Sequence, residues 1–236
     1  MRHFAAAERA VYSRDRDHLS DKQISSKIRS ALHQVMHAAW KGCLMNAVLE
    51  SSETIELFKG RAETVGAQVE RFANREQALE FVVRQLHREG VSDQPRCGAV
   101  WVASPMVSAP VQKQLESDIP GLTFAPTREL AEQARVGVSQ VDWALADTGT
   151  LVQISDEVEK RLVSSLPPLH IALVSTAALL PTLASVIALV DPSKSAYISF
   201  ITGPSRTADI ERVLTIGVHG PERLIVVFVD NLEVEA

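Results

Sequence analysis

Apolar residues recur along this chain at two spacings, and each spacing predicts a different secondary structure. Between residues 20 and 36 they fall three and four positions apart, which is the period of one helix face, and we expect residues 1–60 to be helical throughout. The same period over residues 74–90, with Asn74 as N-cap and Gly90 as stop, predicts a second helix. Strands are expected at residues 66–73, 97–104, 122–125, 169–174, 195–203 and 223–231, and the compact apolar runs of residues 97–104 and 169–174 are typical of buried strands.

The predicted helices and strands alternate, so we expect an α/β fold with a mainly parallel sheet flanked by helices on both faces. Residues 141–146 differ, because apolar and polar positions alternate there and the turn residues Asp147–Gly149 follow. That pattern predicts a β-hairpin whose second strand is residues 150–155. The remaining helices are expected at residues 111–116, 176–190 and 205–214, the last one capped by Ser205 or Thr207.

Composition and charge narrow the classes of protein that fit. With 236 residues, 46% of them hydrophobic and 22% charged, the chain has the composition of a globular protein. Its net charge of −5 disfavours nucleic acid as a partner. No apolar stretch is long enough to cross a membrane and the N-terminus lacks a hydrophobic signal core, so we expect a cytoplasmic protein without membrane insertion.

The sequence predicts neither a metal site nor a cofactor. Its two cysteines, Cys43 and Cys97, lie far apart and are expected to be buried free thiols. An iron–sulfur cluster usually needs four thiolates, so this chain is not expected to hold one unaided. No His, Cys and carboxylate spacing is typical of zinc, and neither a P-loop nor a dinucleotide-binding glycine pattern is present. His170, inside an apolar run, is expected to be a core residue.

Two segments carry candidate binding residues, and the first is the predicted hairpin turn. Asp147, Thr148, Gly149 and Thr150 offer a carboxylate, two hydroxyls and exposed backbone donors, which together can hold an anion. The same residues equally describe an ordinary hairpin turn. Arg161, after an acidic run, either reaches back over this turn or is solvated. The residues themselves leave these alternatives open.

The second segment runs from Gly203 to Pro221. A capped helix start with Arg206 beside it suits a phosphate or carboxylate, whereas Asp209 in the expected first turn repels one. His219 is placed on a loop between two glycines, where an imidazole can serve as acid, base or hydrogen-bond donor. The candidates from this segment are Gly203, Ser205, Arg206, Thr207, Asp209, His219 and Gly220. The alternative is a well-capped helix with an internal Arg–Asp pair and no ligand.

Both segments follow predicted strands, and in doubly wound sheets the ligand crevice lies beyond the carboxyl ends of the strands. We therefore expect Asp147, Thr148, Arg206 and His219 to line one cleft, and a small anionic ligand is the kind that fits such a set. The sequence assigns no catalytic residue.

Long stretches of the chain resemble a known family. The segments ADTGTLVQIS, RLVSSLPPLHIALV and ITGPSRTADIERVLTIGVHGP, in that order, are similar to the LUD domain of the lactate-utilisation protein C family, and FKGRAETVGAQVERFANREQALEFV is similar to its opening. The resemblance implies a NagB/RpiA/CoA-transferase-like fold, the α/β fold of glucosamine-6-phosphate and ribose-phosphate isomerases. The resemblance begins at about residue 44, so we expect a LUD domain over residues 44–236, preceded by a helical N-terminal arm over residues 1–43.

The resemblance also implies a function, namely a non-redox component that supports bacterial oxidation of L-lactate to pyruvate together with iron–sulfur partner proteins. The low cysteine count agrees with that division of labour. Two alternatives stay open. One is a free-standing enzyme of the isomerase or transferase kind that acts on a phosphorylated or CoA-linked substrate, and the other is a ligand-sensing module without chemistry. The sequence also leaves open whether the protein is an enzyme and whether it forms homo-oligomers.

Overall fold

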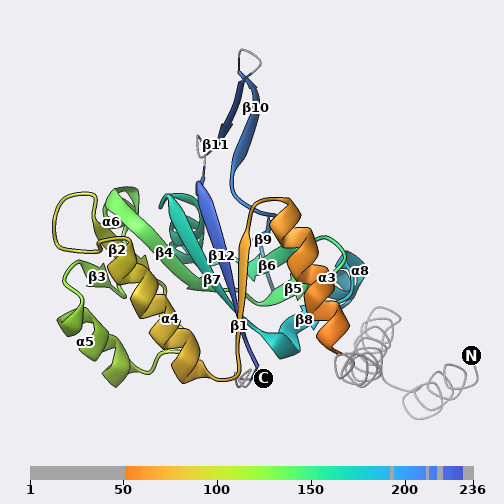
Figure 1. Ribbon diagram of the computed structural model, residues 1–236, viewed down its shortest axis with the longest axis horizontal. Helices are drawn as coiled ribbons and strands as arrows, with labels where there is room; N and C mark the ends of the chain where they lie inside the picture. Colours follow the sequence, from red (N-terminus) through yellow and green to blue (C-terminus); the bar gives the residue numbers. More distant parts are fainter. Residues whose placement is uncertain (1–50, 192–193, 211–212, 217–219, 231–236) are drawn as a thin grey trace, which may run out of the picture. The chain divides into compact units, whose positions relative to one another are not determined.

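The structure is a computed structural model, and it describes residues 51–191, 194–210, 213–216 and 220–230 (Figure 1). The expected helical arm of residues 1–43 lies outside the described residues. Within the described part, a mostly parallel central sheet is flanked by helices, which confirms the predicted α/β fold.

Six parallel strands form the large sheet. In spatial order they are β1 (Gln68–Phe72), β12 (Arg223–Val229), β7 (Leu169–Ser175), β4 (Ala134–Gln140), β2 (Gly98–Trp101) and β3 (Leu122–Thr123). Every neighbouring pair is parallel, so the carboxyl ends of the strands lie at one edge of the sheet. Strand β7 is buried at all its positions, as expected for a parallel strand that is covered on both faces.

A smaller sheet and a separate hairpin complete the described β-structure. The small sheet has the order β8 (Leu179–Leu180), β5 (Trp143–Leu145), β6 (Thr150–Ile154) and β9 (Ile198–Ile201). Its β5–β6 pair is antiparallel, which confirms the predicted hairpin. The separate hairpin is the antiparallel pair β10 (Arg206–Ile210) and β11 (Val213–Ile216).

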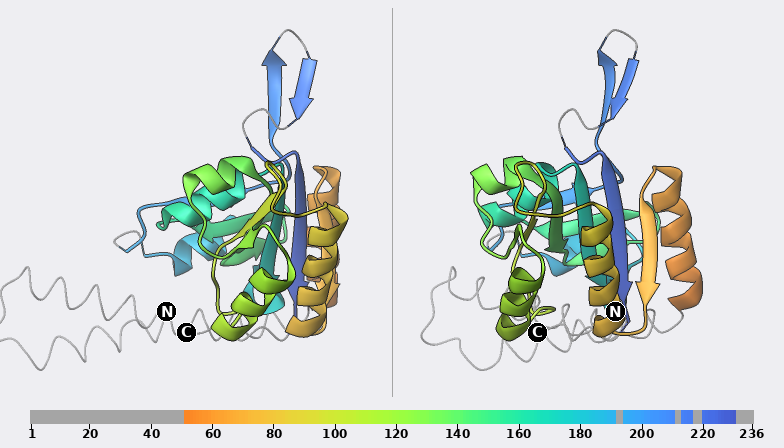
Figure 2. Two further views of the ribbon diagram at one scale, coloured as in Figure 1. Left: turned by 90° about the vertical axis from the view of Figure 1, so that its left-hand side faces the viewer. Right: turned by 60° about the vertical axis from the view of Figure 1, so that its left-hand side comes forward.

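Helices lie on both sides of the large sheet (Figure 2). They are α3 (Ser51–Thr64), α4 (Arg75–Arg88), α5 (Ala109–Asp118), α6 (Arg128–Gln133), α7 (Val158–Ser165) and α8 (Leu183–Leu189), with one short 3-10 helix at Thr176–Ala178. Asn74 caps α4 as predicted, because its side-chain oxygen accepts a hydrogen bond from the Gln77 amide at 2.9 Å.

Each face of the large sheet has its own core, because successive side chains of a strand point to opposite faces. On one face Leu169 and Ile171 of β7 pack with the apolar stripe of α4. On the other face Ala172 and Val174 pack with α3 and with the small sheet, whose Leu151 is completely buried. The small sheet therefore lies against the same face of the large sheet as α3, and the burial of apolar surface on both faces stabilises the arrangement.

The helix predicted over residues 205–214 is wrong, because β10 and β11 form an antiparallel hairpin there. The segment is rich in β-branched residues, which lose rotamer freedom in a helix and favour strands. They are Thr207, Ile210, Val213, Thr215 and Ile216. The helix caps assigned to Ser205 and Thr207 are wrong with it, and so is the placement of Asp209 in a first helical turn.

The helix predicted over residues 176–190 is correct only in its second half. Pro181 has no backbone N–H and clashes with a preceding helical turn, so a helix cannot run through it without a kink. Before it, Leu179 and Leu180 form β8, which pairs with β5. Helix α8 begins at Leu183, after this interruption.

Cys97 is a free thiol that is half-buried, whereas the sequence predicts a buried one; Cys43 lies outside the described residues. In the part of the chain that the structure describes, no helix has both the length and the apolar character that crossing a membrane requires.

Candidate functional site

Strands β2 and β4 are neighbours in the large sheet, and the connections that follow them run toward opposite sides of the sheet. From β2 the chain goes outward to β3, whereas from β4 the next strand of this sheet is β7, on the other side. In open α/β sheets a crevice opens beyond the carboxyl ends of the strands at such a switch point, and ligands bind there. The segments that follow β2 and β4 are therefore where the fold favours a binding site.

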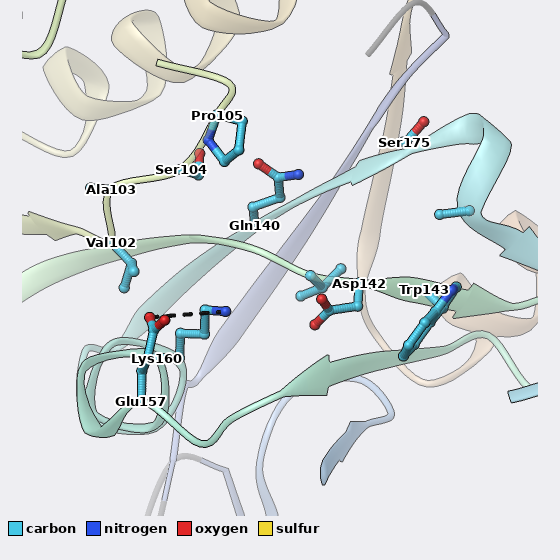
Figure 3. Close-up of a pocket in the computed structure, with 12 residues that line it drawn as sticks. Val102, Ala103, Ser104, Pro105, Gln140, Asp142, Trp143, Glu157, Lys160 and Ser175 are labelled. Carbon is cyan, nitrogen blue, oxygen red and sulfur yellow. Dashed lines mark ion pairs between the residues drawn. The ribbon is translucent and has the colours of Figure 1, made fainter. Parts of the chain in front are cut away.

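A pocket of ≈ 460 Å³ lies at this switch point, and we call it the crevice pocket (Figure 3). The loop after β2, the residues after β4, the start of α7 and the end of β7 form its walls. Its lining residues are Val102, Ala103, Ser104, Pro105, Gln140, Val141, Asp142, Trp143, Glu157, Lys160, Ser175 and Ala178. The volume falls in the range of small-molecule sites, which is roughly 300–1,000 Å³.

Asp142 points its carboxylate into the crevice pocket (Figure 3). The chain passes from the large sheet to the small sheet between Gln140 and Trp143, and Asp142 lies at this crossing. Its Oδ2 accepts a hydrogen bond from the Ile154 amide at 2.6 Å. Burial raises the pKa of Asp142 and outweighs that hydrogen bond and the charge of Lys160, which both lower it. A carboxyl with a raised pKa in a crevice is typical of functional sites.

Lys160 is the cation among the lining residues, and it comes from the first turn of α7. Its side chain is 24% exposed, and its ammonium lies 4.0 Å from Glu157 Oε2, which is too long for a hydrogen bond. The ammonium donors of Lys160 can therefore bind a ligand in the pocket. Among the described residues, no group of three or more His, Cys, Asp or Glu side chains is arranged to hold a metal ion.

Two polar atoms in the pocket wall have no hydrogen-bond partner among the described residues. They are Ser104 Oγ and Gln140 Oε1, both shielded from solvent. The side chains of the two residues lie on the same side of the pocket, at the loop that follows β2 (Figure 3). Buried polar atoms of folded proteins are nearly always hydrogen-bonded, so such exceptions need an explanation. A ligand that hydrogen-bonds to both atoms supplies one.

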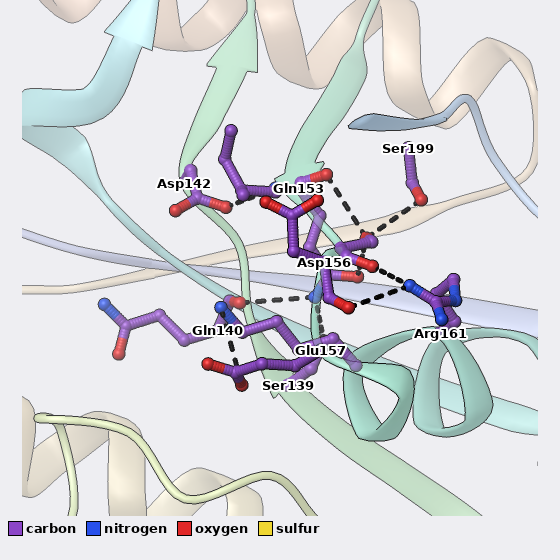
Figure 4. Close-up of polar contacts among 11 residues, drawn as sticks. Ser139, Gln140, Asp142, Gln153, Asp156, Glu157, Arg161 and Ser199 are labelled. Atoms are coloured by element: carbon purple, nitrogen blue, oxygen red, sulfur yellow. Dashed lines mark hydrogen bonds and ion pairs between the residues drawn. The ribbon is translucent and has the colours of Figure 1, made fainter. Parts of the chain in front are cut away.

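Behind the pocket, a chain of buried polar side chains joins the two sheets (Figure 4). Gln153 Nε2 on β6 donates to Ser139 Oγ at 3.0 Å and to the Gln140 carbonyl oxygen at 3.3 Å. Ser155 Oγ donates to Gln153 Oε1 at 3.3 Å, and Ser199 Oγ donates to Ser155 Oγ at 2.9 Å. This network holds the end of β4, which carries Gln140 into the pocket, against the small sheet.

His170 is a core residue, as predicted. It is completely buried, and its Nε2 lies 2.9 Å from Ser139 Oγ, while its Nδ1 has no partner among the described residues. Burial lowers the pKa of His170 to about 4, because a charged imidazolium would lose its hydration there. His170 is therefore neutral near pH 7 and orients the polar network rather than adding charge to the site.

The structure brings the two predicted candidate segments together, but away from the crevice pocket. Strands β6 and β9 pair, and Thr150 Oγ1 lies 2.8 Å from Thr202 Oγ1. Gly149, with a φ of 65°, packs so tightly on α3 that a Cβ there would lie 2.4 Å from the Ala62 amide nitrogen. The turn between β5 and β6 thus requires a glycine.

Gly203 and Arg206 both meet Val65, which follows the end of α3. A Cβ on Gly203 would lie 2.9 Å from the Val65 carbonyl oxygen, and the Arg206 guanidinium donates a hydrogen bond to the same oxygen. The amide of Ser205 donates to the Pro221 carbonyl oxygen at 2.8 Å. These contacts therefore hold residues 203–206 against backbone carbonyl groups of two other parts of the chain, at Val65 and Pro221.

These contacts define what we call the amino-end cluster: Gly149, Thr150, Thr202, Gly203, Ser205, Arg206 and Gly220. Val65 precedes β1 and Pro221 precedes β12, so the cluster lies at the amino ends of these strands. The crevice pocket lies at the carboxyl ends. The expectation that both segments flank the carboxyl-end crevice is wrong, because the strands before them, β5 and β9, belong to the small sheet.

None of the predicted candidates whose side chains the structure describes lines the crevice pocket. Asp147 and Thr148 are exposed, Thr207 and Asp209 belong to β10, and His219 lies outside the described residues. A ligand role for these residues stays a prediction.

Arg161 takes neither of the positions considered for it. Its guanidinium donates to the Ser155 carbonyl oxygen and, at 3.1 Å, to the Asp156 carbonyl oxygen. It also lies over the ring of Tyr197, 4.6 Å from the centroid. Arg161 therefore ties the start of α7 to the segment before β9.

Sequence reasoning missed Ser104, Gln140, Asp142 and Lys160. A signal was present for two of them, because Gln140 and Asp142 stand at the end of the apolar run VGVS, and the carboxyl-end rule applies to that run as well. The alternating pattern of residues 141–146 conceals the break, since it reads as one strand that begins at Val141, whereas β5 begins at Trp143. Lys160 carries no such signal, because charged residues in a first helical turn are common.

Fold and pocket together define an α/β protein with a parallel sheet and a crevice pocket, lined by polar and apolar side chains, at its switch point. The family model of the LUD domain matches residues 55–229, which is most of the chain, and the chain belongs to this family. The resemblance found in the sequence is thereby confirmed. The matched range includes the crevice pocket and the amino-end cluster alike.

Curated relatives carry the name Lactate utilization protein C. The protein of that name from Halalkalibacterium halodurans is 38% identical over 109 residues, which are 44% of this chain and 47% of the relative. That from Exiguobacterium sp. is 38% identical over 112 residues, which are 45% and 49%. The chain thus spans about half the length of the curated relatives it matches. A solved DUF162 family protein from Deinococcus radiodurans is similar with a TM-score of 0.49 and 18% identity, covering 75% of this chain and 97% of that chain.

Proposed function

We propose that this protein is a non-redox component of a bacterial lactate-utilisation system. In this role it supports the oxidation of L-lactate to pyruvate in the cytoplasm, alongside iron–sulfur partner proteins. The observation that carries the proposal is the family: residues 55–229 match the LUD domain, and relatives at 38% identity carry the name Lactate utilization protein C.

Two features of the chain support a division of labour with redox partners. Its two cysteines are fewer than the four thiolates that an iron–sulfur cluster usually takes, which is consistent with the proposal that partner proteins carry the iron–sulfur centres. The crevice pocket has the size of a small-molecule site, and its lining combines apolar side chains with polar ones. Both the low cysteine count and the crevice pocket fit a component that binds a small molecule while its partner proteins transfer the electrons.

The proposal is tested by deleting the gene in its host and comparing growth on L-lactate with growth on pyruvate. We expect the deletion strain to grow on pyruvate and to fail on L-lactate, because only the oxidation step is lost. A plasmid copy of the full chain should restore growth. A copy with Cys97→Ala should restore it equally, because Cys97 is a free thiol outside the crevice pocket. Normal growth of the deletion strain on L-lactate contradicts the proposal.

The partners are tested separately by affinity capture of the tagged full chain from cells grown on L-lactate. We expect iron–sulfur proteins to co-purify, with their visible absorbance in the eluate. Capture that recovers the chain without them contradicts the partner part of the proposal and leaves the growth result standing.

A further inference from the structure

Beside the donors of Lys160, the crevice pocket offers hydrogen-bond acceptors on two side chains, Gln140 and Asp142. Gln140 Oε1 has no donor among the described residues, and the Asp142 carboxylate faces the cavity while one of its oxygens accepts from the Ile154 amide. An ionised carboxylate only accepts, and each of its oxygens accepts more than one hydrogen bond. Ser104 Oγ, also unpartnered, serves as donor or acceptor. The lining therefore fits a ligand that donates hydrogen bonds, which points to hydroxyl groups.

The charge of the lining limits how much negative charge the ligand carries. Lys160 is one cation against the carboxylates of Asp142 and Glu157, so the lining has a formal charge of −1. A ligand with several negative charges meets repulsion in such a site, because like charges brought together in a crevice cost free energy. A single carboxylate is accommodated, since the Lys160 ammonium is only 4.0 Å from Glu157 and keeps donors for a second acceptor.

The remaining walls are apolar and suit a short carbon chain. Val102, Val141 and Ala178 line the pocket, and the ring of Trp143 forms one flank (Figure 3). At ≈ 460 Å³ the pocket has room for a hydroxy acid of several carbons as well as for the smallest ones.

We propose that the crevice pocket binds a hydroxy monocarboxylic acid: Lys160 holds its carboxylate, and Asp142 and Gln140 accept hydrogen bonds from its hydroxyl groups. This goes beyond the proposed function, because it names the ligand class and the residues that select it, and the pocket chemistry holds whichever pathway the protein serves. A keto acid lacks the donor that the acceptors need, and a phosphorylated sugar acid brings charge that the lining repels.

The experiment is isothermal titration calorimetry of the purified full chain with probes that differ in one group. L-lactate, pyruvate and propionate share the three-carbon carboxylate and differ at the hydroxyl, while gluconate and 6-phosphogluconate differ by the phosphate. We expect L-lactate to bind at least ~5-fold more tightly than pyruvate or propionate, which is the size of one hydrogen bond. Gluconate should bind at least ~10-fold more tightly than 6-phosphogluconate, since the phosphate brings roughly two more negative charges into a lining whose formal charge is already −1.

The residue assignment is tested with paired variants. Lys160→Met and Asp142→Asn should each weaken binding of gluconate by roughly 10-fold or more, because each removes a charged partner of the ligand. The matched controls are Lys113→Met on the exposed face of α5 and Asp147→Asn in the exposed hairpin turn, which should bind as the wild type does. If Lys160→Met does not fold, Ser104→Ala, a small change in the loop after β2, should still weaken binding.

Three results overturn the inference: no hydroxy acid binds, pyruvate or propionate binds as tightly as L-lactate, or 6-phosphogluconate binds more tightly than gluconate. Unchanged binding in both Lys160→Met and Asp142→Asn overturns the residue assignment. These outcomes are independent of the growth test. Failure of growth on L-lactate without hydroxy-acid binding removes only the pocket inference, and hydroxy-acid binding without a growth defect removes only the lactate role.

Discussion

The crevice pocket and the amino-end cluster lie at opposite edges of the same parallel sheet, and they use polar residues in different ways. In the pocket, Ser104 Oγ and Gln140 Oε1 have no partner among the described residues. In the cluster, Arg206 donates to the Val65 carbonyl oxygen, and Thr150 and Thr202 pair with each other. The crevice pocket therefore contains polar atoms without hydrogen-bond partners, whereas these polar side chains of the amino-end cluster are hydrogen-bonded within the protein.

The two regions also differ in how closely the backbone packs. Gly149 and Gly203 of the cluster have positive φ angles, and a Cβ on either would collide with the segment around the end of α3. The residues of the crevice pocket instead enclose an open volume of ≈ 460 Å³. A dense run of Gly, Pro and charged residues can therefore reflect close packing as well as ligand binding. What separates the two is whether the polar atoms have partners.

The largest effect is expected from Gly149→Ala in the cluster. The methyl group would lie 2.4 Å from the Ala62 nitrogen at a φ of 65°, so overpacking and left-handed backbone strain add up. We expect the free energy of unfolding to fall by about 4 kcal/mol. Urea unfolding measures it.

The matched control for Gly149→Ala is Gly60→Ala in α3. A Cβ on Gly60 has no neighbour within 4 Å, and alanine is the better helix former, so this variant should be more stable by about 0.5–1 kcal/mol. Equal stability of Gly149→Ala and the wild type would mean that the cluster is loosely packed, and its role as a structural contact would then be wrong.

The next largest effect concerns acid stability and arises beneath the pocket. His170 has a folded-state pKa of about 4 against 6.5 in the unfolded chain, so the unfolded state binds a proton more readily. The stabilisation from neutral His170 is complete above pH 6.5 and is lost as the pH falls toward 4. A shift of this size corresponds to about 3 kcal/mol. Urea unfolding at several pH values should show the loss.

Two histidine variants show whether the acid effect belongs to the core. His170→Gln should flatten the pH dependence between pH 6.5 and 4, because the titrating group is gone. His87→Gln, at an exposed position of α4, should leave the pH dependence as it is in the wild type. If His87→Gln flattened the curve and His170→Gln did not, the acid sensitivity would lie outside the polar network behind the pocket.

The sequence was sufficient for most of the fold because local patterns there agree with the tertiary contacts. Helix α4 has an amphipathic stripe and the cap Asn74, and β7 is one compact apolar run. The hairpin β10–β11 is different, since apolar positions at a helix-like spacing compete with a high content of β-branched residues. Reading the spacing alone gave a helix where the chain forms strands.

The sequence alone does not locate the candidate site, because two pieces of tertiary information are needed. The carboxyl-end rule needs to know which strands share the parallel sheet, and β5 and β9 belong to the small sheet. Which atoms lack partners is a property of packing that no sequence pattern carries, as Gln140 shows: its backbone oxygen is bound by Gln153 while its side-chain oxygen is unpartnered. Asp142 stands out only once the crossing between the two sheets is known.

A smaller effect is expected from Arg206→Ala, which distinguishes the two roles considered for the cluster. Arg206 is exposed and its guanidinium donates to the Val65 carbonyl oxygen, so its loss should reduce the free energy of unfolding by about 1 kcal/mol. Gluconate binding, corrected for the folded fraction, should stay unchanged, because Arg206 does not line the crevice pocket. Weaker gluconate binding at an unchanged free energy of unfolding would show that Arg206, and with it the amino-end cluster, takes part in ligand binding.

The smallest effect is expected from Asp142→Asn in the pocket, which we compare with Asp147→Asn in the exposed hairpin turn that precedes Gly149 of the cluster. Burial raises the pKa of Asp142 above its ordinary value of 3.8, with Lys160 and Glu157 acting on it in opposite directions. Stability from the neutral carboxyl is therefore complete below pH 3.8 and is lost as the pH rises through the folded-state pKa.

Asp142→Asn removes this ionisation and keeps an acceptor for the Ile154 amide, so it should melt slightly above the wild type at pH 7. The advantage should disappear below pH 3.8, where the wild-type carboxyl is neutral in both states. Asp147→Asn is the matched substitution at an exposed position and should change the melting temperature little at either pH. Differential scanning fluorimetry across this pH range measures both variants. A lower melting temperature of Asp142→Asn at pH 7 would show that the ionised carboxylate stabilises the ligand-free fold. The polar groups of the pocket would then have their partners within the protein, as those of the cluster do.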